Sequence, residues 1–260
     1  MNAPSVLTQV GHLARRSITR TLRQPALIVP GLAFPLFLLA INSGGLDAAT
    51  DLPGFPTPSY VTFALAITFV QAAIFATNIA GTNLAEDIRT GFLDRLALTP
   101  MRGVALLSGQ LAGVLALGVF QGIVYIAIGL AAGVTIEAGV GGAVVMIALS
   151  VTIAGAFGAI GLLAALRTGS GEAVQGLFPL MFALLFLSAL SLPLELIEHD
   201  WFRTIATYNP VTYLLQGLRS LLIFGWQAGP LLEAFAIAAG AFGLAITASA
   251  VALRRRLVRT

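Results

Sequence analysis

The chain has 260 residues, of which 58% are hydrophobic and only 10% are charged, and its mean hydropathy is +0.94. Because a soluble domain carries about 25% charged residues, this composition predicts an all-α integral membrane protein. The sequence has no cysteine and no lysine, which excludes disulfides, a thiolate metal site, a cysteine nucleophile and the P-loop lysine that binds ATP. The formal net charge is +3, but the arginines flank apolar runs, which indicates membrane orientation rather than binding to nucleic acid.

Residues 6–23 are predicted to form an amphipathic helix before the first membrane span. The apolar half of its helical wheel holds Val6, Leu7, Val10, Leu13, Ala14, Ile18 and Leu22. The opposite half holds Thr8, Gln9, His12, Arg15, Arg16, Thr19, Arg20 and Arg23. A basic face opposite an apolar face is typical of a helix that lies in the membrane interface. The alternative is a signal peptide with residues 26–41 as its apolar part, although the charged lead is too long for one.

Six apolar stretches are predicted to cross the membrane as helices. They are residues 26–41, extended at both ends, and residues 61–84, 104–134, 143–166, 174–194 and 231–253. A membrane-spanning helix needs about 20 predominantly apolar residues. Small-residue spacings such as Gly109 with Gly113 permit close contact between helices.

The arginines predict the orientation of these spans. With the N-terminus in the cytoplasm, all of the fourteen arginines except Arg203 and Arg219 lie inside, as the positive-inside rule requires. Both termini are then cytoplasmic. The loops on the other side carry acidic residues instead: Asp47, Asp51, Glu137, Glu195, Glu198 and Asp200.

Residues 195–225 are predicted to form an external re-entrant helix pair. The apolar piece at 211–224 is about 21 Å long as a helix, which is short of a ~30 Å membrane core. A seventh span is the alternative, but it would place the C-terminal arginines outside. One group of side chains has the residue types of a metal site: Glu195, Glu198, His199 and Asp200. Such a group is more typical of a solvated helix end, so no metal site is predicted.

The spans carry amides but almost no ionisable groups. The polar exceptions are Gln71, Asn78, Asn83, Gln110 and Gln121. Ion-driven carriers place acidic or basic groups at mid-membrane, so the sequence argues against such a carrier. The amides either join helices by hydrogen bonds or touch a substrate, and Gln71, Asn78 and Gln121 are the candidates for a substrate path.

Residues 86–102 form a polar island between two apolar stretches. Its charged side chains are Glu86, Asp87, Arg89, Asp94, Arg95 and Arg102. On one helix, Ile88, Phe92, Leu93 and Leu96 would share a face opposite Asp87, Asp94 and Arg95. Thr99-Pro100 would end that helix. Composition alone does not distinguish a solvated loop helix from a docking element.

Two motifs resemble those of ABC-2 type permeases, the membrane subunits of ABC exporters such as the daunorubicin-resistance type. Residues 91–100, GFLDRLALTP, are similar to the family pattern G-T-L-x-R-L-x-x-T-P, and residues 209–213, NPVTY, followed by Leu218 and Arg219, are similar to N-P-V-T-Y…L-R. Phe92 departs from the usual threonine, and Gln110 stands where a lysine is common. The resemblance covers essentially the whole chain.

The resemblance implies that residues 86–102 are a coupling helix that docks on a separate cytoplasmic ATPase. Its contact residues would be Asp87, Ile88, Gly91, Phe92, Leu93, Asp94, Arg95, Leu96, Thr99 and Pro100, and the external motif would comprise Asn209, Pro210, Tyr213 and Arg219. This chain would not be an enzyme itself, since ATP and Mg²⁺ would be bound by two copies of the ATPase.

The expected complex is a homodimer of permease subunits, or a pair with a close relative, in the bacterial plasma membrane. Apolar, aliphatic spans favour the export of an amphiphilic drug-like or lipid-linked molecule. A membrane scaffold that does not transport, or less readily an ion-coupled carrier, is the alternative. Transport that depends on ATP would distinguish the exporter from the scaffold.

Overall fold

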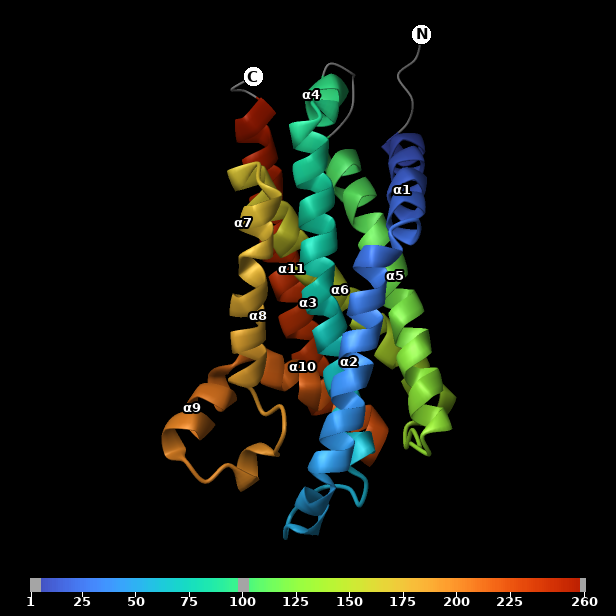
Figure 1. The fold of residues 1–260 in the computed structure, drawn as a ribbon, viewed down its shortest axis with the longest axis vertical. Coiled ribbons are helices and arrows are strands. Elements are labelled where there is room, and N and C mark those ends of the chain that lie inside the picture. The colour runs from blue at the N-terminus through green and yellow to red at the C-terminus, as the bar shows by residue number, and fades with distance from the viewer. Residues whose placement is uncertain (1–5, 98–102, 258–260) are drawn as a thin grey trace.

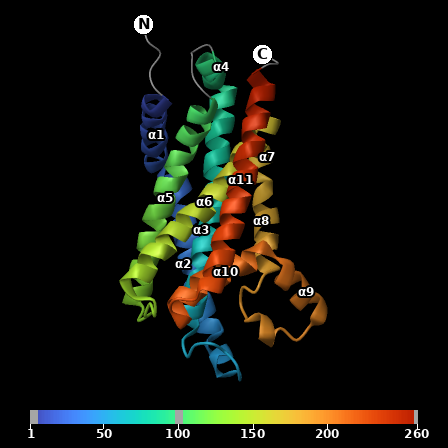
Figure 2. The same cartoon turned by 180° about the vertical axis from the view of Figure 1, so that it is seen from behind.

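The computed structural model describes residues 6–97 and 103–257, and within them every regular element is helical. The long helices are α1 Val6–Leu22, α2 Pro25–Gly45, α3 Tyr60–Arg89, α5 Gly103–Ala131, α6 Gly139–Thr168 and α11 Ala228–Leu257. The shorter ones are α4 Phe92–Ala97, α7 Gly171–Gln175, α8 Leu177–Phe186, α9 Asp200–Tyr208 and α10 Pro210–Arg219, with single turns η1 Asp47–Asp51, η2 Leu194–Leu196 and η3 Ser220–Phe224. Both termini and α4 lie at one end of an elongated bundle, and α9 lies at the other (Figures 1 and 2).

Within the described residues, five helices are long and apolar enough to cross a membrane: α2, α3, α5, α6 and α11. They correspond to five of the six predicted spans. The residues predicted for the remaining span, 174–194, instead form the short helices α7 and α8, and the helix ends at Phe186. Pro179 explains the break at Gly176, because proline has no N–H to donate to the carbonyl one turn earlier. The apolar segment Gly171–Phe186 is therefore only about 24 Å long.

α3 is the central helix of the bundle, and most of its residues are buried. It crosses α6 at two glycines, Gly81 and Gly161. A Cβ atom on Gly161 would collide with the backbone carbonyl oxygen of Thr77, and one on Gly81 would lie 2.8 Å from the Gly161 oxygen. The Thr77 hydroxyl donates a hydrogen bond to the Phe157 oxygen at the same crossing (3.0 Å). Small residues thus bring the two backbones together, as they do between membrane helices.

α1 packs lengthwise against α5 rather than across the end of the bundle (Figures 1 and 2). Ser17 and Thr21 are buried in this contact, whereas the apolar Leu7 is 84% exposed. The Ser17 hydroxyl donates to the Gln110 oxygen (2.9 Å), and side chains of α1 occupy the space beside Gly109 and Gly113. The polar half of α1 therefore partly faces the protein, and its predicted place in the membrane interface stays a prediction.

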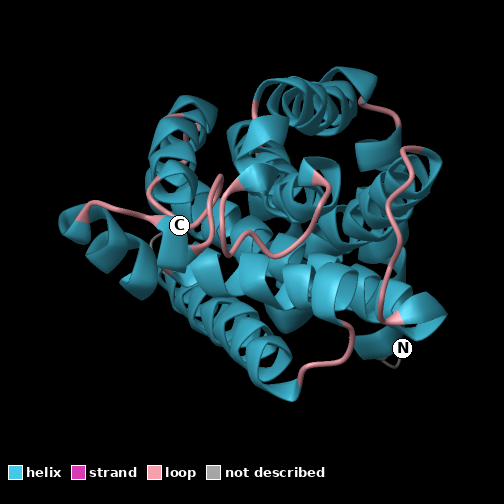
Figure 3. Ribbon diagram, turned by 90° about the horizontal axis from the view of Figure 1, so that it is seen from below, coloured by secondary structure: helices cyan, strands magenta, loops and turns pink. Residues whose placement is uncertain are grey.

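α9 and α10 form the helix pair predicted for residues 195–225, at the end of the bundle that Figure 3 views. They are divided at Asn209, whose side-chain oxygen accepts a hydrogen bond from the Val211 N–H (2.9 Å) and whose amide donates to the Leu184 oxygen (2.7 Å). Pro210 occupies the first position of α10, where its missing N–H costs nothing. α10 is mostly buried against α11 and α3, while α9 projects outward (Figure 2).

Candidate functional site

The polar island begins as an extension of α3. Residues 86–89 continue this helix without a break, Gly91 has a φ of +66°, and α4 covers only Phe92–Ala97. A left-handed backbone conformation is accessible to glycine at little cost, so the chain turns there. The predicted single helix over residues 86–102, with Ile88 and Phe92 on a common face, is wrong for this reason.

The turn at Gly91 places the predicted coupling residues in different environments. Leu93 is only 1% exposed and anchors α4 to the bundle. Ile88, in the last turn of α3, packs against the same apolar cluster, so these two side chains do not present an apolar ridge to a partner. Arg95 is exposed. The side chains of Asp94 and Leu96, and all of Thr99 and Pro100, lie outside the described residues.

Asp87 is the centre of a polar cluster that joins four helices. Its carboxylate accepts two hydrogen bonds from Arg16 (2.8 and 3.1 Å), one from Arg20 (2.8 Å) and one from the Gln110 amide (2.7 Å). The Arg16 guanidinium also lies over the Phe92 ring, 3.9 Å from its centroid. We call Asp87, Arg16, Arg20, Gln110 and Phe92 the Asp87 cluster. It connects α1, α3, α4 and α5.

The electrostatics of the Asp87 cluster favour an ionised carboxylate. Asp87 is only 3% exposed, and it lies three residues beyond Leu84, where the apolar stretch ends. Burial raises the pKa of this carboxyl, but hydrogen bonds from Arg16 and Gln110 and the charges of both arginines outweigh burial and hold its pKa below the ordinary value. Hydrogen bonds between charged groups are about twice as strong as neutral ones. Asp87 is thus engaged within the chain, whereas the resemblance implied that it would contact the ATPase.

The two residues that depart from the family pattern, Phe92 and Gln110, both belong to the Asp87 cluster. Sequence reasoning did not find Arg16 and Arg20 as the partners of Asp87. One signal was available in the sequence. Arg16 and Arg20 are four residues apart and therefore share a helix face, and two adjacent cations on one face are stabilised by a nearby anion. The anion lies 71 residues from Arg16 in the sequence, so the pattern of one helix does not reveal it.

The three candidate amides of the substrate path divide into two groups. Gln121 donates a hydrogen bond to the Gly31 oxygen (3.2 Å), beside the Tyr125 hydroxyl, which donates to the same oxygen (2.7 Å), so Gln121 joins α5 to α2. By contrast, the side-chain oxygens of Gln71 and Asn78 are buried and have no hydrogen-bond partner in the described chain. Unsatisfied buried acceptors are rare in native proteins.

Gln71 and Asn78 lie on one face of α3, with Phe75 between them. The Phe75 ring is in contact with a row of aromatic rings from α2 and α8, at centroid distances of 6.1 Å to Phe34 and 5.1 Å to Phe178. Phe34 in turn meets Phe182 at 5.8 Å. This row of aromatic rings joins α2 to α8 beside the two unsatisfied oxygens.

The second motif lies at the opposite end of the bundle. Asn209 and Pro210 begin α10 as described above, Tyr213 is partly buried, and Arg219 is buried with 5% exposure. Nearby, Glu195, Glu198, His199 and Asp200 are exposed, and no group of three or more His, Cys, Asp or Glu side chains that could hold a metal ion occurs among the described residues.

Comparison with known proteins identifies the family. A model of the ABC-2 type transporter family matches residues 8–223, which include α1, both motifs and the Asp87 cluster. A search of curated proteins found no match. With its membrane-spanning helices, the chain is a multi-pass membrane protein and a transporter component of a class that works with an ATP-binding subunit. The chain belongs to the ABC-2 type transporter family.

Proposed function

We propose that this chain is the membrane-spanning permease subunit of an ATP-driven exporter, and that a separate cytoplasmic ATPase binds ATP and Mg²⁺. The observation that carries the proposal is the junction of α3 and α4. α3 is continuous from Tyr60 to Arg89, and Leu93 anchors α4 against the same bundle. A displacement of α4 by an ATPase would therefore reach the central helix without passing through a flexible linker.

The orientation follows from the end of the bundle that carries α4. Both termini lie at this end (Figure 1), and so do the arginine-bearing last turn of α11 and the arginines of the Asp87 cluster. The positive-inside rule supports our proposal that this is the cytoplasmic end. The localisation we propose is the bacterial plasma membrane, with α9 and the Arg219 motif outside.

The assembly we propose contains two copies of this chain and two ATPase subunits. The contact between Phe34 and Phe182 joins α2 to α8, and both helices carry exposed apolar side chains: Phe37 and Ile41 on α2, and Leu180 and Phe186 on α8. A second copy seated there would cover these side chains. It would also enclose the row of aromatic rings and the unsatisfied oxygens of Gln71 and Asn78, which suit an amphiphile with an aromatic or aliphatic body and a hydrogen-bond donor.

The dimer can be tested directly because the chain has no cysteine. The variants Phe37→Cys and Leu180→Cys each introduce a single thiol, and mild oxidation is expected to give a disulfide-linked dimer with at least one of them. Leu244→Cys on α11, 77% exposed in the wild type, is the control and should stay monomeric. If only the control variant Leu244→Cys formed a disulfide-linked dimer, the interface would lie on α11 instead.

Coupling is tested with the double substitution Arg95→Glu plus Leu96→Asp. We expect it to abolish co-purification of a co-expressed ABC ATPase and ATP-dependent efflux of an amphiphilic fluorescent anthracycline. Membrane insertion should be unchanged. Arg203→Glu, the same charge reversal at the opposite end, is the control. If the double variant still captured the ATPase and exported the dye as the wild type does, the coupling assignment would be wrong. If the wild type captured the ATPase but showed no ATP-dependent efflux, the chain would be a membrane scaffold instead of an exporter.

A further inference from the structure

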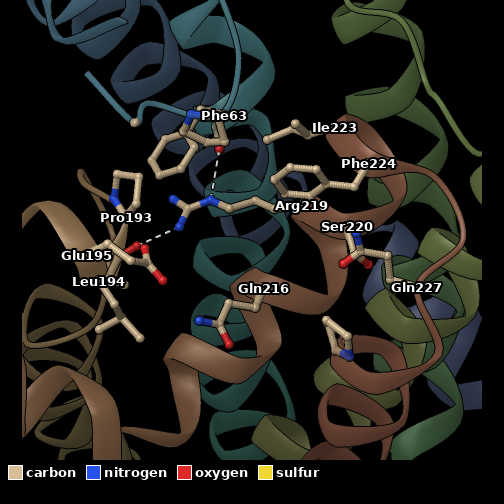
Figure 4. Close-up of a pocket in the computed structure, with 14 residues that line it drawn as sticks. Phe63, Pro193, Leu194, Glu195, Gln216, Arg219, Ser220, Ile223, Phe224 and Gln227 are labelled. Atoms are coloured by element: carbon tan, nitrogen blue, oxygen red, sulfur yellow. Dashed lines mark hydrogen bonds between the residues drawn. The ribbon is translucent and has the colours of Figure 1, made fainter. Parts of the chain in front are cut away.

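A cavity of about 510 Å³ opens at the end of the bundle opposite the termini. It lies between the first turns of α3, the segment that follows α8, α10 with η3, and the start of α11 (Figure 4). Its polar lining consists of Glu195, Gln216, Arg219, Ser220 and Gln227, and its apolar lining includes Phe63, Pro193, Leu194, Ile223, Phe224 and Pro230. This volume is in the range of small-molecule sites, which combine an apolar lining with a few polar groups.

Arg219 is the buried cation of this cavity. Its guanidinium donates to the backbone oxygens of Phe63 (3.2 Å), Ala189 (2.6 Å) and Leu190 (2.6 Å), and it lies 3.5 Å from the centre of the Phe63 ring. Figure 4 shows it reaching across the cavity from the end of α10 towards Phe63 of α3. Among the described residues, no ion pair joins Arg219 to a carboxylate. The guanidinium is thus held by the dipoles of three backbone carbonyl groups and by the face of the Phe63 ring, not by a carboxylate.

This arrangement leaves both charge and hydrogen-bonding capacity for a ligand. A guanidinium has five N–H donors, and the three bonds above use one donor on each nitrogen. The two terminal nitrogens each keep one further N–H. A cation that is withdrawn from water without a counter-ion is costly to bury, and a phosphate or carboxylate oxygen both neutralises it and accepts the remaining donors.

We propose that this cavity binds the phosphate or carboxylate head of an amphiphile, with Arg219 as the anion-binding residue and Phe224 and Ile223 against the apolar chain. Gln216 and Gln227 supply further polar contacts beside the head. Glu195 is exposed, where water screens its charge from the bound anion. The proposal requires neither an ATPase nor transport, so it stands or falls separately from the coupling site.

The probe is octyl phosphate, titrated into the full chain reconstituted in nanodiscs of phosphatidylcholine. The chain has two tryptophans, and Trp226 lies between the cavity-lining residues Phe224 and Gln227. With Trp201→Phe as the background, Trp226 becomes the sole tryptophan reporter. We expect a saturable change in its emission with octyl phosphate, and binding at least about tenfold weaker with octan-1-ol or inorganic phosphate, because each lacks one half of the ligand.

Three variants test the assignment of the residues. Arg219→Gln removes the charge, and Gln216→Phe fills the cavity with Arg219 intact; each should weaken binding of octyl phosphate by about tenfold or more. Arg203→Gln removes an arginine outside the cavity and should bind like the background. If Arg219→Gln does not fold, Gln216→Phe decides the test.

Three outcomes would overturn the proposal. Equal binding of octan-1-ol would show that the anion is not recognised. Equal binding of inorganic phosphate would show a site for a free anion without an apolar part. Undiminished affinity in the Gln216→Phe variant would place the probe elsewhere.

Discussion

Replacing Asp87 by asparagine removes the one negative charge of the Asp87 cluster at almost constant volume. Arg16 and Arg20 then lose their shared anion and face each other across an uncharged amide. Removing one partner from a buried ion pair costs about 3–5 kcal/mol. The side chains of Arg16 and Arg20 are 36% and 23% exposed, so water recovers part of this, and we expect a loss of roughly 2–3 kcal/mol.

Two measurements report this loss. The unfolding midpoint of the purified permease should fall by roughly 5–10 °C, since about 1 kcal/mol corresponds to 2–4 °C for a protein of this size. The second measurement is trypsin cleavage within α1, followed by mass spectrometry. α1 depends on the Asp87 cluster for its connection to α3, so cleavage after Arg16 and Arg20 should become faster than in the wild type.

Glu86→Gln is the matched control for this prediction. It removes the same charge one residue away, but Glu86 pairs with Arg89 on the exposed side of α3 (2.7 Å), where water and salt screen an ion pair so that it contributes little to stability. If Asp87→Asn and Glu86→Gln lowered the midpoint equally and left α1 equally resistant to trypsin, the assignment of α1 to the Asp87 cluster would be wrong.

Two further predictions concern stability measured by the same thermal assay. Gly161→Ala should strongly destabilise the protein, because the added Cβ would collide with the Thr77 carbonyl. The control is Gly240→Ala, at a helical position with open space, which should be neutral or stabilising by up to about 1 kcal/mol. An unchanged midpoint for Gly161→Ala would contradict the close crossing of α3 and α6. Gln110→Lys, the residue common in the family, should be less stable than Gln110→Met, which only removes a hydrogen bond worth about 1–2 kcal/mol, because a third cation would crowd Asp87. A lysine variant as stable as the wild type would refute this account of the charges.

Hydropathy and length were sufficient to predict the five long apolar helices, because both are local properties of the sequence. The stretch 174–194 is equally apolar, but Gly176 and Pro179 interrupt its backbone hydrogen bonds, which a hydropathy sum does not register. The island 86–102 failed for a related reason. A helical wheel assumes uninterrupted helical geometry, and the positive φ of Gly91 invalidates the wheel after residue 90.

Contacts between distant segments were the part that the sequence did not predict. The polar face of α1 was correctly taken as helical, but its contact with Asp87 depends on how α1 packs on α5. Arg219 was recognised within a motif, yet its burial depends on carbonyl groups of α3 and of the segment that follows α8. Local patterns predict which faces are polar, and only the packed fold determines what each polar group meets.

The length of α3 has a thermodynamic consequence for the two ends of the molecule. Phe63, whose carbonyl oxygen accepts from Arg219, and Asp87 lie on this one helix, about 36 Å apart along its axis, with no proline between them. If a ligand at Arg219 and a partner at α4 both favour the same position of α3, each raises the affinity for the other, and linkage requires the two factors to be equal. Measuring either affinity with and without the other ligand would give the coupling free energy from both directions, and the two values must agree.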